Sequence, residues 1–268
     1  MSSPSLANQI KALTFDVFGT CVDWRTSVVS ALEEAAARKT ASPSFSSSVP
    51  QDVQVLVKSF THDSWASFAQ EWRSSYGRFT WGFVPGSSAW KDIDTHHRDS
   101  LVELLDSHQL SGLYTPEEME RLSKVWHFLA PWPDSSAGIH ELGKRFAVST
   151  LSNGNQSLLA DLNEHGDLGF QLLISAEDFK AYKPNPATYL GACRLLGLEP
   201  NQVAMVAAHL GDLDAAHELG LRTIYVERSN EESWKQDEPR YAEAKKWVDV
   251  WVSENEGGFL TVAERLGV

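Results

Sequence analysis

The sequence is poor in cysteine and has no long apolar run. Its 268 residues include only Cys21 and Cys193, too few for a disulfide scaffold and without the CxxC or Cys/His spacing of a zinc site. No stretch reaches the ~18 consecutive apolar residues of a membrane helix, and the first residues lack the basic and apolar regions of a signal peptide. We therefore expect a cytoplasmic protein with reduced cysteines and no membrane partner.

Positive charge is also scarce. The chain has 23 Lys and Arg against 36 Asp and Glu, which gives a formal net charge of −13, and the few basic residues are not clustered. This balance opposes the approach of a phosphate backbone, so we expect no nucleic-acid partner. With 42% hydrophobic residues, the chain can bury a substantial core as one large domain or two modest ones. The sequence is also compatible with a homodimer.

What the sequence does contain is an alternation of short apolar runs with helical patterns. Continuous apolar runs of this length are typical of strands buried on both faces. The alternation predicts an α/β fold with a doubly wound, Rossmann-like parallel sheet. The expected strands are residues 10–15, 146–151, 171–175, 203–208, 223–226 and, less regularly, 247–252, and the expected helices between the later strands are residues 157–165, 186–196, 213–219 and 259–266.

A second domain is expected between the first two runs. They are about 130 residues apart, far more than one crossover connection needs, and the interval has helical patterns at residues 53–76, 90–107 and 116–129. Seven of the ten tryptophans lie from Trp24 to Trp132, and we interpret most of them as helix-packing residues. We therefore predict a core domain of residues 1–22 and 131–268 and an inserted helical cap domain of residues 23–130.

Polar residues follow four of the predicted strands. Asp16 ends the first, Ser152 and Asn153 follow the second, Lys183 lies beyond the third, and Asp212 follows the fourth. Because the carboxyl ends of parallel strands meet at one edge of the sheet, where open α/β folds bind ligands, we expect these side chains to lie close together. Asp16 is then a candidate nucleophile, although an isolated Asp at this position could equally cap a loop.

The order of these motifs supports a family resemblance. With the helical insert after the first motif, Phe15-Asp16-Val17-Phe18-Gly19-Thr20, the sequence resembles the haloacid dehalogenase superfamily, and specifically its 2-haloacid dehalogenase (type II) branch, over essentially the whole chain. The resemblance implies that Asp16 displaces halide from the substrate carbon and forms an ester that water then hydrolyses. It implies a small anionic carboxylate as the substrate, with short 2-haloalkanoic acids converted to 2-hydroxy acids.

The same resemblance implies roles for further residues. Lys183 would keep Asp16 ionised and oriented, and Thr20 and Ser152 would help to place the substrate carboxylate or the nucleophile. The positions that cradle the departing halide in this family match Arg73 of the cap, Asn153 and Tyr189. Without the resemblance, Arg73 would be interpreted as a solvated charge on a helix.

Two positions distinguish the chain from the magnesium-dependent phosphatases of the same superfamily. Phe18 stands where the phosphatases carry a second Asp that protonates an alkoxide leaving group, whereas a halide leaves without a proton. Ala208 stands where they carry an Asp for Mg²⁺, and Asp16 with Asp212 alone would make a poor magnesium site. We predict a metal-independent reaction that needs no cofactor.

One position departs from the best-known dehalogenases, which carry Asn where this chain has His209. Asp212 lies three residues later, so we predict that it orients His209 as a general base for the water that opens the ester, unless the imidazole only hydrogen-bonds within its loop.

The same His and Asp arrangement resembles that of cis-epoxysuccinate hydrolases. An epoxide hydrolase acting on a small carboxylated epoxide is therefore the first rival function, and a low-activity binding or metabolic-repair protein is the second. The other eight histidines are interpreted as surface or packing residues.

Overall fold

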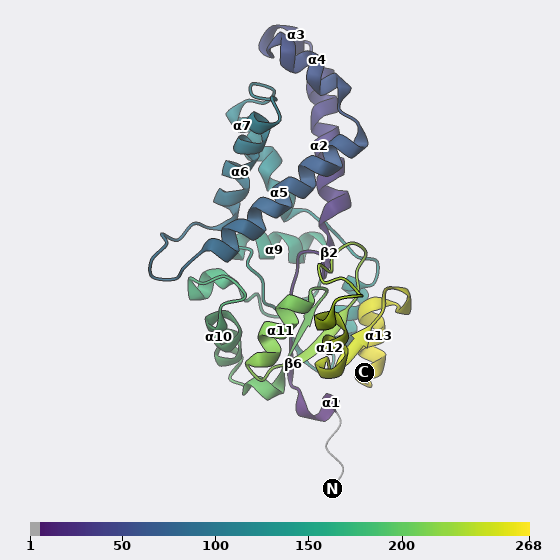
Figure 1. Ribbon diagram of the computed structural model, residues 1–268. Coiled ribbons are helices and arrows are strands. Elements are labelled where there is room, and N and C mark those ends of the chain that lie inside the picture. Colours follow the sequence, from purple (N-terminus) through teal and green to yellow (C-terminus); the bar gives the residue numbers. More distant parts are fainter. Residues whose placement is uncertain (1–5) are drawn as a thin grey trace. The chain divides into compact units, whose positions relative to one another are not determined.

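The computed structural model describes residues 6–268 (Figure 1). They divide into a core unit, made of the described residues up to Asp23 together with Ala130–Val268, and a cap unit, Trp24–Leu129. Each junction lies one residue from the position predicted from sequence. Within the core unit, the two ends of the interrupted chain pair as antiparallel strands, β2 (Val22–Asp23) with β3 (Ala130–Pro131).

The core unit is built on a five-stranded sheet in which every neighbouring pair of strands is parallel. The strand order is β4 (Ala147–Thr150), β1 (Ala12–Phe15), β5 (Val203–Ala207), β6 (Arg222–Val226) and β7 (Val250–Val252). All residues of β1 and β5 are buried, as their continuous apolar runs require. The predicted α/β fold is confirmed, and β1, β4 and β5 end at the same edge of the sheet because Phe15 lies opposite both Thr150 and Val206.

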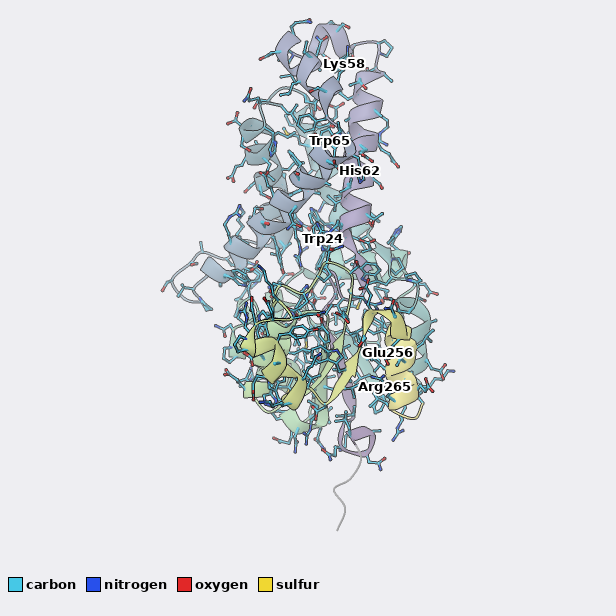
Figure 2. All side chains as sticks on the ribbon, turned by 45° about the vertical axis from the view of Figure 1, so that its right-hand side comes forward. Trp24, Lys58, His62, Trp65, Glu256 and Arg265 are labelled. Carbon is cyan, nitrogen blue, oxygen red and sulfur yellow. The ribbon has the colours of Figure 1, made fainter. Side chains whose placement is uncertain are left out.

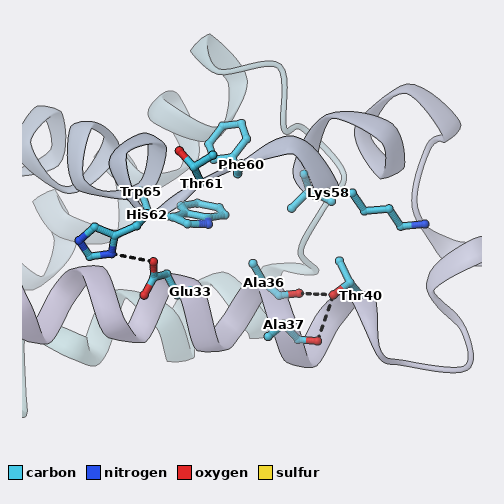
Figure 3. Close-up of a pocket in the computed structure, with 10 residues that line it drawn as sticks. Glu33, Ala36, Ala37, Thr40, Lys58, Phe60, Thr61, His62 and Trp65 are labelled. Carbon is cyan, nitrogen blue, oxygen red and sulfur yellow. Dashed lines mark hydrogen bonds and ion pairs between the residues drawn. The ribbon is translucent and has the colours of Figure 1, made fainter.

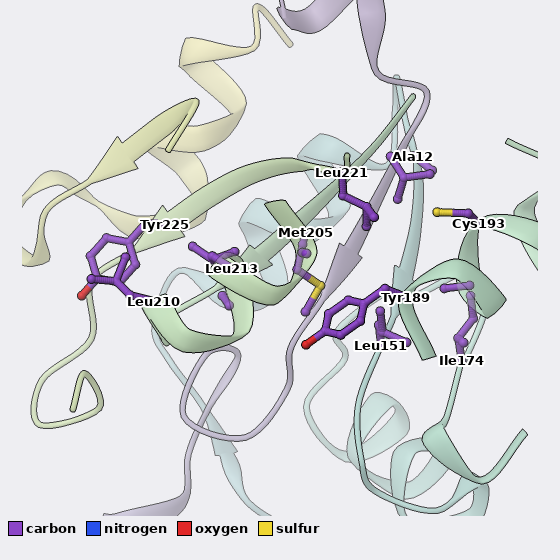
Figure 4. Close-up of a cluster of buried hydrophobic side chains, with 14 of the residues drawn as sticks. Ala12, Leu151, Ile174, Tyr189, Cys193, Met205, Leu210, Leu213, Leu221 and Tyr225 are labelled. Atoms are coloured by element: carbon purple, nitrogen blue, oxygen red, sulfur yellow. The ribbon is translucent and has the colours of Figure 1, made fainter. Parts of the chain in front are cut away.

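Helices cover both faces of this sheet. On one face, alternate β5 residues such as Met205 pack with Tyr189, Leu213 and Tyr225 in the cluster of Figure 4. On the other face, the Phe15 ring meets Phe259 edge-on with 5.2 Å between ring centroids. The core helices are α1 (Leu6–Gln9), α8 (Ser135–Leu142), α9 (Gln156–His165), α10 (Pro186–Leu196), α11 (Leu210–Glu218), α12 (Pro239–Trp247) and α13 (Gly258–Arg265), with short 3-10 turns η2 (Ala176–Phe179), η3 (Pro200–Gln202) and η4 (Glu254–Glu256).

Two strand predictions need correction. The strand predicted at residues 171–175 is wrong, because this segment makes only isolated bridges, from Leu172 to Ser149 of β4 and from Ser175 to Ser152 just beyond β4. Leu172 is 41% exposed, whereas Ile174 is fully buried. The run at residues 247–252 holds two elements, since Trp247 ends α12 and β7 begins three residues later.

The cap unit is helical, as predicted, but one of its predicted helices is broken. The pattern at residues 53–76 is interrupted at Phe60 because Thr61 starts a new helix, exchanging side-chain and backbone hydrogen bonds with Ser64 in a capping box. The cap elements are α2 (Trp24–Thr40), α3 (Phe45–Ser48), α4 (Gln51–Ser59), α5 (His62–Gly82), α6 (Ile93–Ser107), α7 (Pro116–Ser123) and the 3-10 turn η1 (Lys124–His127).

Tryptophans fill much of the cap interior. Trp24 stacks on Trp126 with ring centroids 6.0 Å apart, and Trp72 meets Trp126 edge-on at 5.4 Å. Figure 2 places Trp24 and Trp65 among the cap helices, and all four of these rings are buried. These four have the packing role expected from sequence, whereas Trp81 is 78% exposed.

The cap unit also has two surface cavities. One, of about 390 Å³, lies between α2 and the corner that joins α4 to α5 (Figure 3), where His62 Nδ1 lies 2.9 Å from Glu33 Oε1. The other, of about 570 Å³, is lined by residues of α2, α7 and η1. Neither is lined by a residue of the predicted site. No helix among residues 6–268 is long and apolar enough to cross a membrane.

Candidate active site

Asp16 lies at the carboxyl end of β1, one residue beyond the strand. Its backbone N–H donates to Val206 O at 2.9 Å, and the Cys21 thiol donates to Asp16 O at 3.1 Å. These contacts fix the main chain on both sides of the carboxylate. The residue is only 8% exposed, so a carboxylate here needs compensating partners.

Thr20 and Lys183 supply two of these partners. The Thr20 hydroxyl donates to Asp16 Oδ2 at 2.8 Å and accepts from the Ala208 N–H at 2.9 Å, so its proton is directed at Asp16. Lys183 Nζ donates to Asp16 Oδ1 at 2.9 Å and to Asp212 Oδ2 at 2.6 Å. The Lys183 ammonium thus bridges two carboxylates that come from opposite ends of the sequence.

These partners decide the charges of the site. Burial alone would raise the pKa of Asp16, but Lys183 and His209 outweigh it and hold that pKa well below its usual range. Burial would likewise lower the pKa of Lys183, yet the two carboxylates keep it above the ordinary value. At neutral pH the site therefore holds an ionised Asp16 against a charged ammonium.

Asp212 lies in the first turn of α11 and binds Tyr189 as well as Lys183. The Tyr189 hydroxyl, fully buried, donates to Asp212 Oδ1 at 2.5 Å. Burial raises the pKa of Tyr189, and the charge of Asp212 raises it further, so the phenol stays protonated. Its single proton is directed at Asp212, whereas the family resemblance implied that Tyr189 faces the halide. Burial also raises the pKa of Asp212, against the opposing effect of Lys183.

Asn153 and Ser152 lie in the loop after β4, and both are buried. Asn153 Oδ1 accepts from the Lys183 N–H at 2.7 Å, and Nδ2 makes a long 3.5 Å contact with Lys183 O. The amide therefore positions the main chain of Lys183, and a role at the halide stays a prediction. Ser152 Oγ accepts from the Gly154 N–H at 3.2 Å.

His209 has different partners from those predicted. Its Nδ1 lies 3.1 Å from Asp16 Oδ2 and its Nε2 lies 3.3 Å from Glu231 Oε2, while the Asp212 side chain is held by Lys183 and Tyr189. The prediction that Asp212 orients His209 is therefore wrong. Sequence proximity was a poor guide because His209 precedes α11, whereas Asp212 lies within its first turn.

The two carboxylates also change the charge of His209. Burial would lower the pKa of the ring, but the hydrogen bonds to Asp16 and Glu231 raise it to about 10. A protonated imidazole donates from both nitrogens, so neither is free to take a proton from water. In this arrangement His209 is a cation and a hydrogen-bond donor rather than a general base.

Arg73 belongs to the cap unit, on α5. Its guanidinium lies over the Tyr76 ring at 4.5 Å and over the Trp24 ring at 5.8 Å. These contacts are within the cap, so its halide-binding role stays a prediction.

Glu231 and Arg228 are residues that the sequence reasoning missed. Both follow β6, and Arg228 Nε donates to Thr20 O at 3.0 Å while its two terminal nitrogens bind Asp134. A signal was available, because the run Glu227-Arg228-Ser229-Asn230-Glu231-Glu232 follows a predicted strand at the edge where the other motifs meet.

The carboxylates at this edge do not form a divalent-cation site. Asp16 Oδ1 and Asp212 Oδ2 both face the Lys183 ammonium, and Phe18 and Ala208 supply no side-chain oxygen. Among residues 6–268, no group of three or more His, Cys, Asp or Glu side chains is arranged to hold a metal. We derive no step through a metal.

Comparison with known proteins agrees with this arrangement. The family model of the haloacid dehalogenase-like hydrolases matches residues 10–220. The chain belongs to this family. Among curated proteins it is similar to (S)-2-haloacid dehalogenase 4A of Burkholderia cepacia, with 24% identity over 92% of this chain and 95% of that protein. It is also similar to (S)-2-haloacid dehalogenase 1 of Pseudomonas sp. (strain CBS-3), with 28% identity over 67% and 80% of the two chains.

Solved structures of the same family resemble the whole chain. The defluorinating L-2-haloacid dehalogenase Rha0230 matches with a TM-score of 0.79 and 30% identity over 97% of this chain and 96% of that one. The L-2-haloacid dehalogenase PA0810 matches with a TM-score of 0.76 and 31% identity over 96% and 100%. The haloacid dehalogenase assignment made from the four motifs is confirmed.

Proposed function

We propose that the protein is a hydrolytic dehalogenase that converts short 2-haloalkanoic acids to 2-hydroxy acids. The observation that carries the proposal is the buried, ionised Asp16 carboxylate, held by Lys183 at 2.9 Å at the end of the sheet where α/β folds bind ligands. The similar proteins are named (S)- or L-2-haloacid dehalogenases, and we propose the same enantiomer for this chain.

The proposed reaction has two steps. An Asp16 oxygen attacks C2 of the substrate, and the carbon–halogen bond breaks with its electron pair leaving on the halide. Water then attacks Asp16 Cγ, and the bond from Cγ to the bridging oxygen breaks, which releases the 2-hydroxy acid and restores the carboxylate. The water loses one proton to the product hydroxyl and one to the medium.

Phe18 fits a halide as the leaving group. An alkoxide would need a proton as it departs, and the phosphatase position that supplies it carries a phenyl ring here. Because a halide ion needs no proton, the first step does not depend on an acid at this position. Metal independence is supported by Ala208, which stands where the phosphatases carry an Asp for Mg²⁺.

One observation supports a second candidate. His209 carries a positive charge beside Asp16, and such a group can donate to an epoxide oxygen as the ring opens. The second candidate is therefore an epoxide hydrolase that opens a small carboxylated epoxide to the diol.

One panel separates the two functions. Halide release is measured on 2-chloro, 2-bromo and 2-fluoro acids, each as separate enantiomers, beside diol formation from a carboxylated epoxide. The proposal expects halide from the (S) acids, with ¹⁸O from labelled water appearing on Asp16 before it appears in product. Diol without halide from any acid would replace it by the second candidate, and label passing straight into product would remove Asp16 as the nucleophile.

A further inference from the structure

Glu231 reaches the site on a loop that is tied to the Asp16 loop. The Glu231 N–H donates to Arg228 O at 3.3 Å, and Arg228 in turn donates to Thr20 O and to both oxygens of Asp134. The Glu231 side chain is only 6% exposed. The loop after β6 therefore holds a buried carboxylate at a defined place beside His209.

Gly19 makes room for this carboxylate. A Cβ at position 19 would lie 2.0 Å from Glu231 Oε2, and the backbone of Gly19 has a φ of +81°, which favours glycine. Any larger residue there would displace Glu231 from His209. The nucleophile loop is thus shaped to admit Glu231.

The hydrogen bonds distinguish the two oxygens of Asp16. Among residues 6–268, Oδ2 accepts from both Thr20 and His209, whereas Oδ1 accepts from Lys183 alone. Each carboxylate oxygen has about two lone-pair sites, so those of Oδ2 are filled and one on Oδ1 remains. Oδ1 is therefore the oxygen able to attack, and Oδ2 becomes the carbonyl oxygen of the ester.

We propose that His209 and Thr20 form an oxyanion-binding site for Asp16 Oδ2 during hydrolysis of the ester, and that Glu231 is the positioning residue that keeps His209 charged there. This inference rests on the proposed function. As water bonds to Cγ, the C=O electron pair moves onto Oδ2, where the two donors already point. Collapse of the intermediate re-forms the C=O bond and breaks the bond from Cγ to Oδ1.

Glu231 matters most in the second step. The charged groups that reach the His209 ring are Asp16 on one nitrogen and Glu231 on the other. When the ester forms, Asp16 loses its negative charge, and of the two carboxylates that the described part of the chain places on the ring, Glu231 is the one that stays charged. The Glu231 contact therefore sustains the imidazolium at the stage where an oxyanion develops.

The test compares the two steps in Glu231→Gln, which keeps the shape of the side chain and removes its charge. We expect a halide burst close to one per site at the wild-type rate, followed by turnover slowed about 10- to 100-fold, below the ~10²–10³-fold typical for removal of a whole oxyanion donor. The Asp16 ester should accumulate and be visible by mass spectrometry. Glu227→Gln is the matched control, because Glu227 lies in the same loop and binds the Glu254 N–H instead.

A measurement on the resting enzyme separates this inference from the proposed function. By NMR, the His209 ring should be protonated at pH 7 in the wild type and should titrate at lower pH in Glu231→Gln. This result needs no substrate, so it stands even if no 2-halo acid releases halide. In a His209→Asn background, Glu231→Gln should add no further slowing, because no ring charge remains to sustain.

Three outcomes would overturn the inference. One is a neutral His209 ring at pH 7 in the wild type. Another is a Glu231→Gln variant whose burst and turnover slow equally, which would indicate only a structural role. The third is a variant in which neither step changes.

Discussion

His96 and His97 of the cap unit and His209 of the core unit have pKa values shifted in opposite directions. In the cap, His96 stacks on Phe79 with ring centroids 4.4 Å apart, and His97 stacks on Trp126 at 4.5 Å. Burial lowers the pKa of His96 to about 4, and it lowers that of His97 well below the usual range. In the core, His209 is 27% exposed by its side chain and has a pKa raised to about 10.

The difference follows from what touches each ring. Burial disfavours the charged form at all three positions, but only His209 hydrogen-bonds a carboxylate from each nitrogen. His97 Nδ1 has no hydrogen-bond partner among residues 6–268, and its ring is neutral. His96 and His97 are neutral aromatic packing residues, whereas His209 is a cation held between two carboxylates.

Removing the nucleophile should have the largest effect on turnover, and it should also bring the pKa of His209 closer to those of the cap histidines. Asp16→Asn keeps the size of the side chain but removes the ionised oxygen that attacks, so turnover should fall by ~10⁴-fold or more. His209 also loses one of its two carboxylates, and its pKa should fall. Halide release and NMR titration of the ring measure the two effects. Sustained turnover in this variant would contradict the assignment of Asp16.

Removing the ammonium should destabilise the core unit. Lys183→Met removes the ammonium between Asp16 and Asp212, and loss of one partner of a buried pair costs about 3–5 kcal/mol of unfolding free energy. Lys144→Met is the control, because Lys144 pairs with Glu141 at the surface and should change stability by under ~1 kcal/mol. Urea unfolding at neutral pH measures both. Similar losses of unfolding free energy in the two variants would show that the buried ion pairs of Lys183 stabilise the protein no more than the surface pair of Lys144.

The charge of His209 should appear in the pH dependence of turnover. The pKa of His209 is higher in the folded protein than in the unfolded chain. The stabilisation that the charged ring gives to the folded state is therefore present below about pH 6.5 and is lost as pH rises through about 10. Turnover should fall on an alkaline limb as the ring loses its proton, and this limb should lie below pH 10 because the ester removes the negative charge of Asp16 from beside the ring. His209→Ala should lose this limb and slow turnover about 100-fold while halide is still released in a burst. A limb that persists in the variant would assign it to another group.

His97 should give the opposite pH dependence, in stability rather than in turnover. The pKa of His97 is lower in the folded protein than in the unfolded chain. The stability that the neutral ring gives to the folded state is therefore complete above about pH 6.5 and is lost as pH falls. The protein should therefore be less stable at pH 5 than at pH 8. His97→Phe keeps an aromatic ring against Trp126 and should remove that part of the acid destabilisation, as measured by urea unfolding at pH 5 and pH 8. An unchanged difference between the two pH values would show that the His97 ring titrates normally.

Metal removal should have the smallest effect. Because Lys183 occupies the space between Asp16 and Asp212, EDTA should leave halide release unchanged. Phosphate monoesters should not be hydrolysed with or without Mg²⁺. Magnesium-dependent phosphatase activity would overturn the interpretation of Phe18 and Ala208.

Sequence patterns predicted the sheet and the order of the site motifs because both depend on short-range rules. Apolar runs marked β1, β4, β5 and β6, and parallel pairing then brought Asp16 and Asp212 to one edge, where Lys183 reaches both from a segment that is not a strand. The partner of His209 was not predictable in this way. Glu231 lies 22 residues further along, and its place depends on the Arg228 anchor and on the space at Gly19. The break at Phe60 was missed because Thr61 and Ser64 interrupt no hydrophobic pattern.

The contact from Arg228 to Thr20 has a consequence for the nascent chain during its synthesis. It joins residues 208 positions apart, and it holds the loop that carries Asp16. At a synthesis rate of roughly 5–20 residues per second, the ribosome adds the intervening residues in about 10–40 s. During that interval Asp16 has been synthesised, but the hydrogen bond from Arg228 to Thr20 that holds its loop cannot yet form. We expect a ribosome-bound chain stalled before Arg228 to be inert, so that the enzyme becomes active only after Arg228 has been added and has reached Thr20.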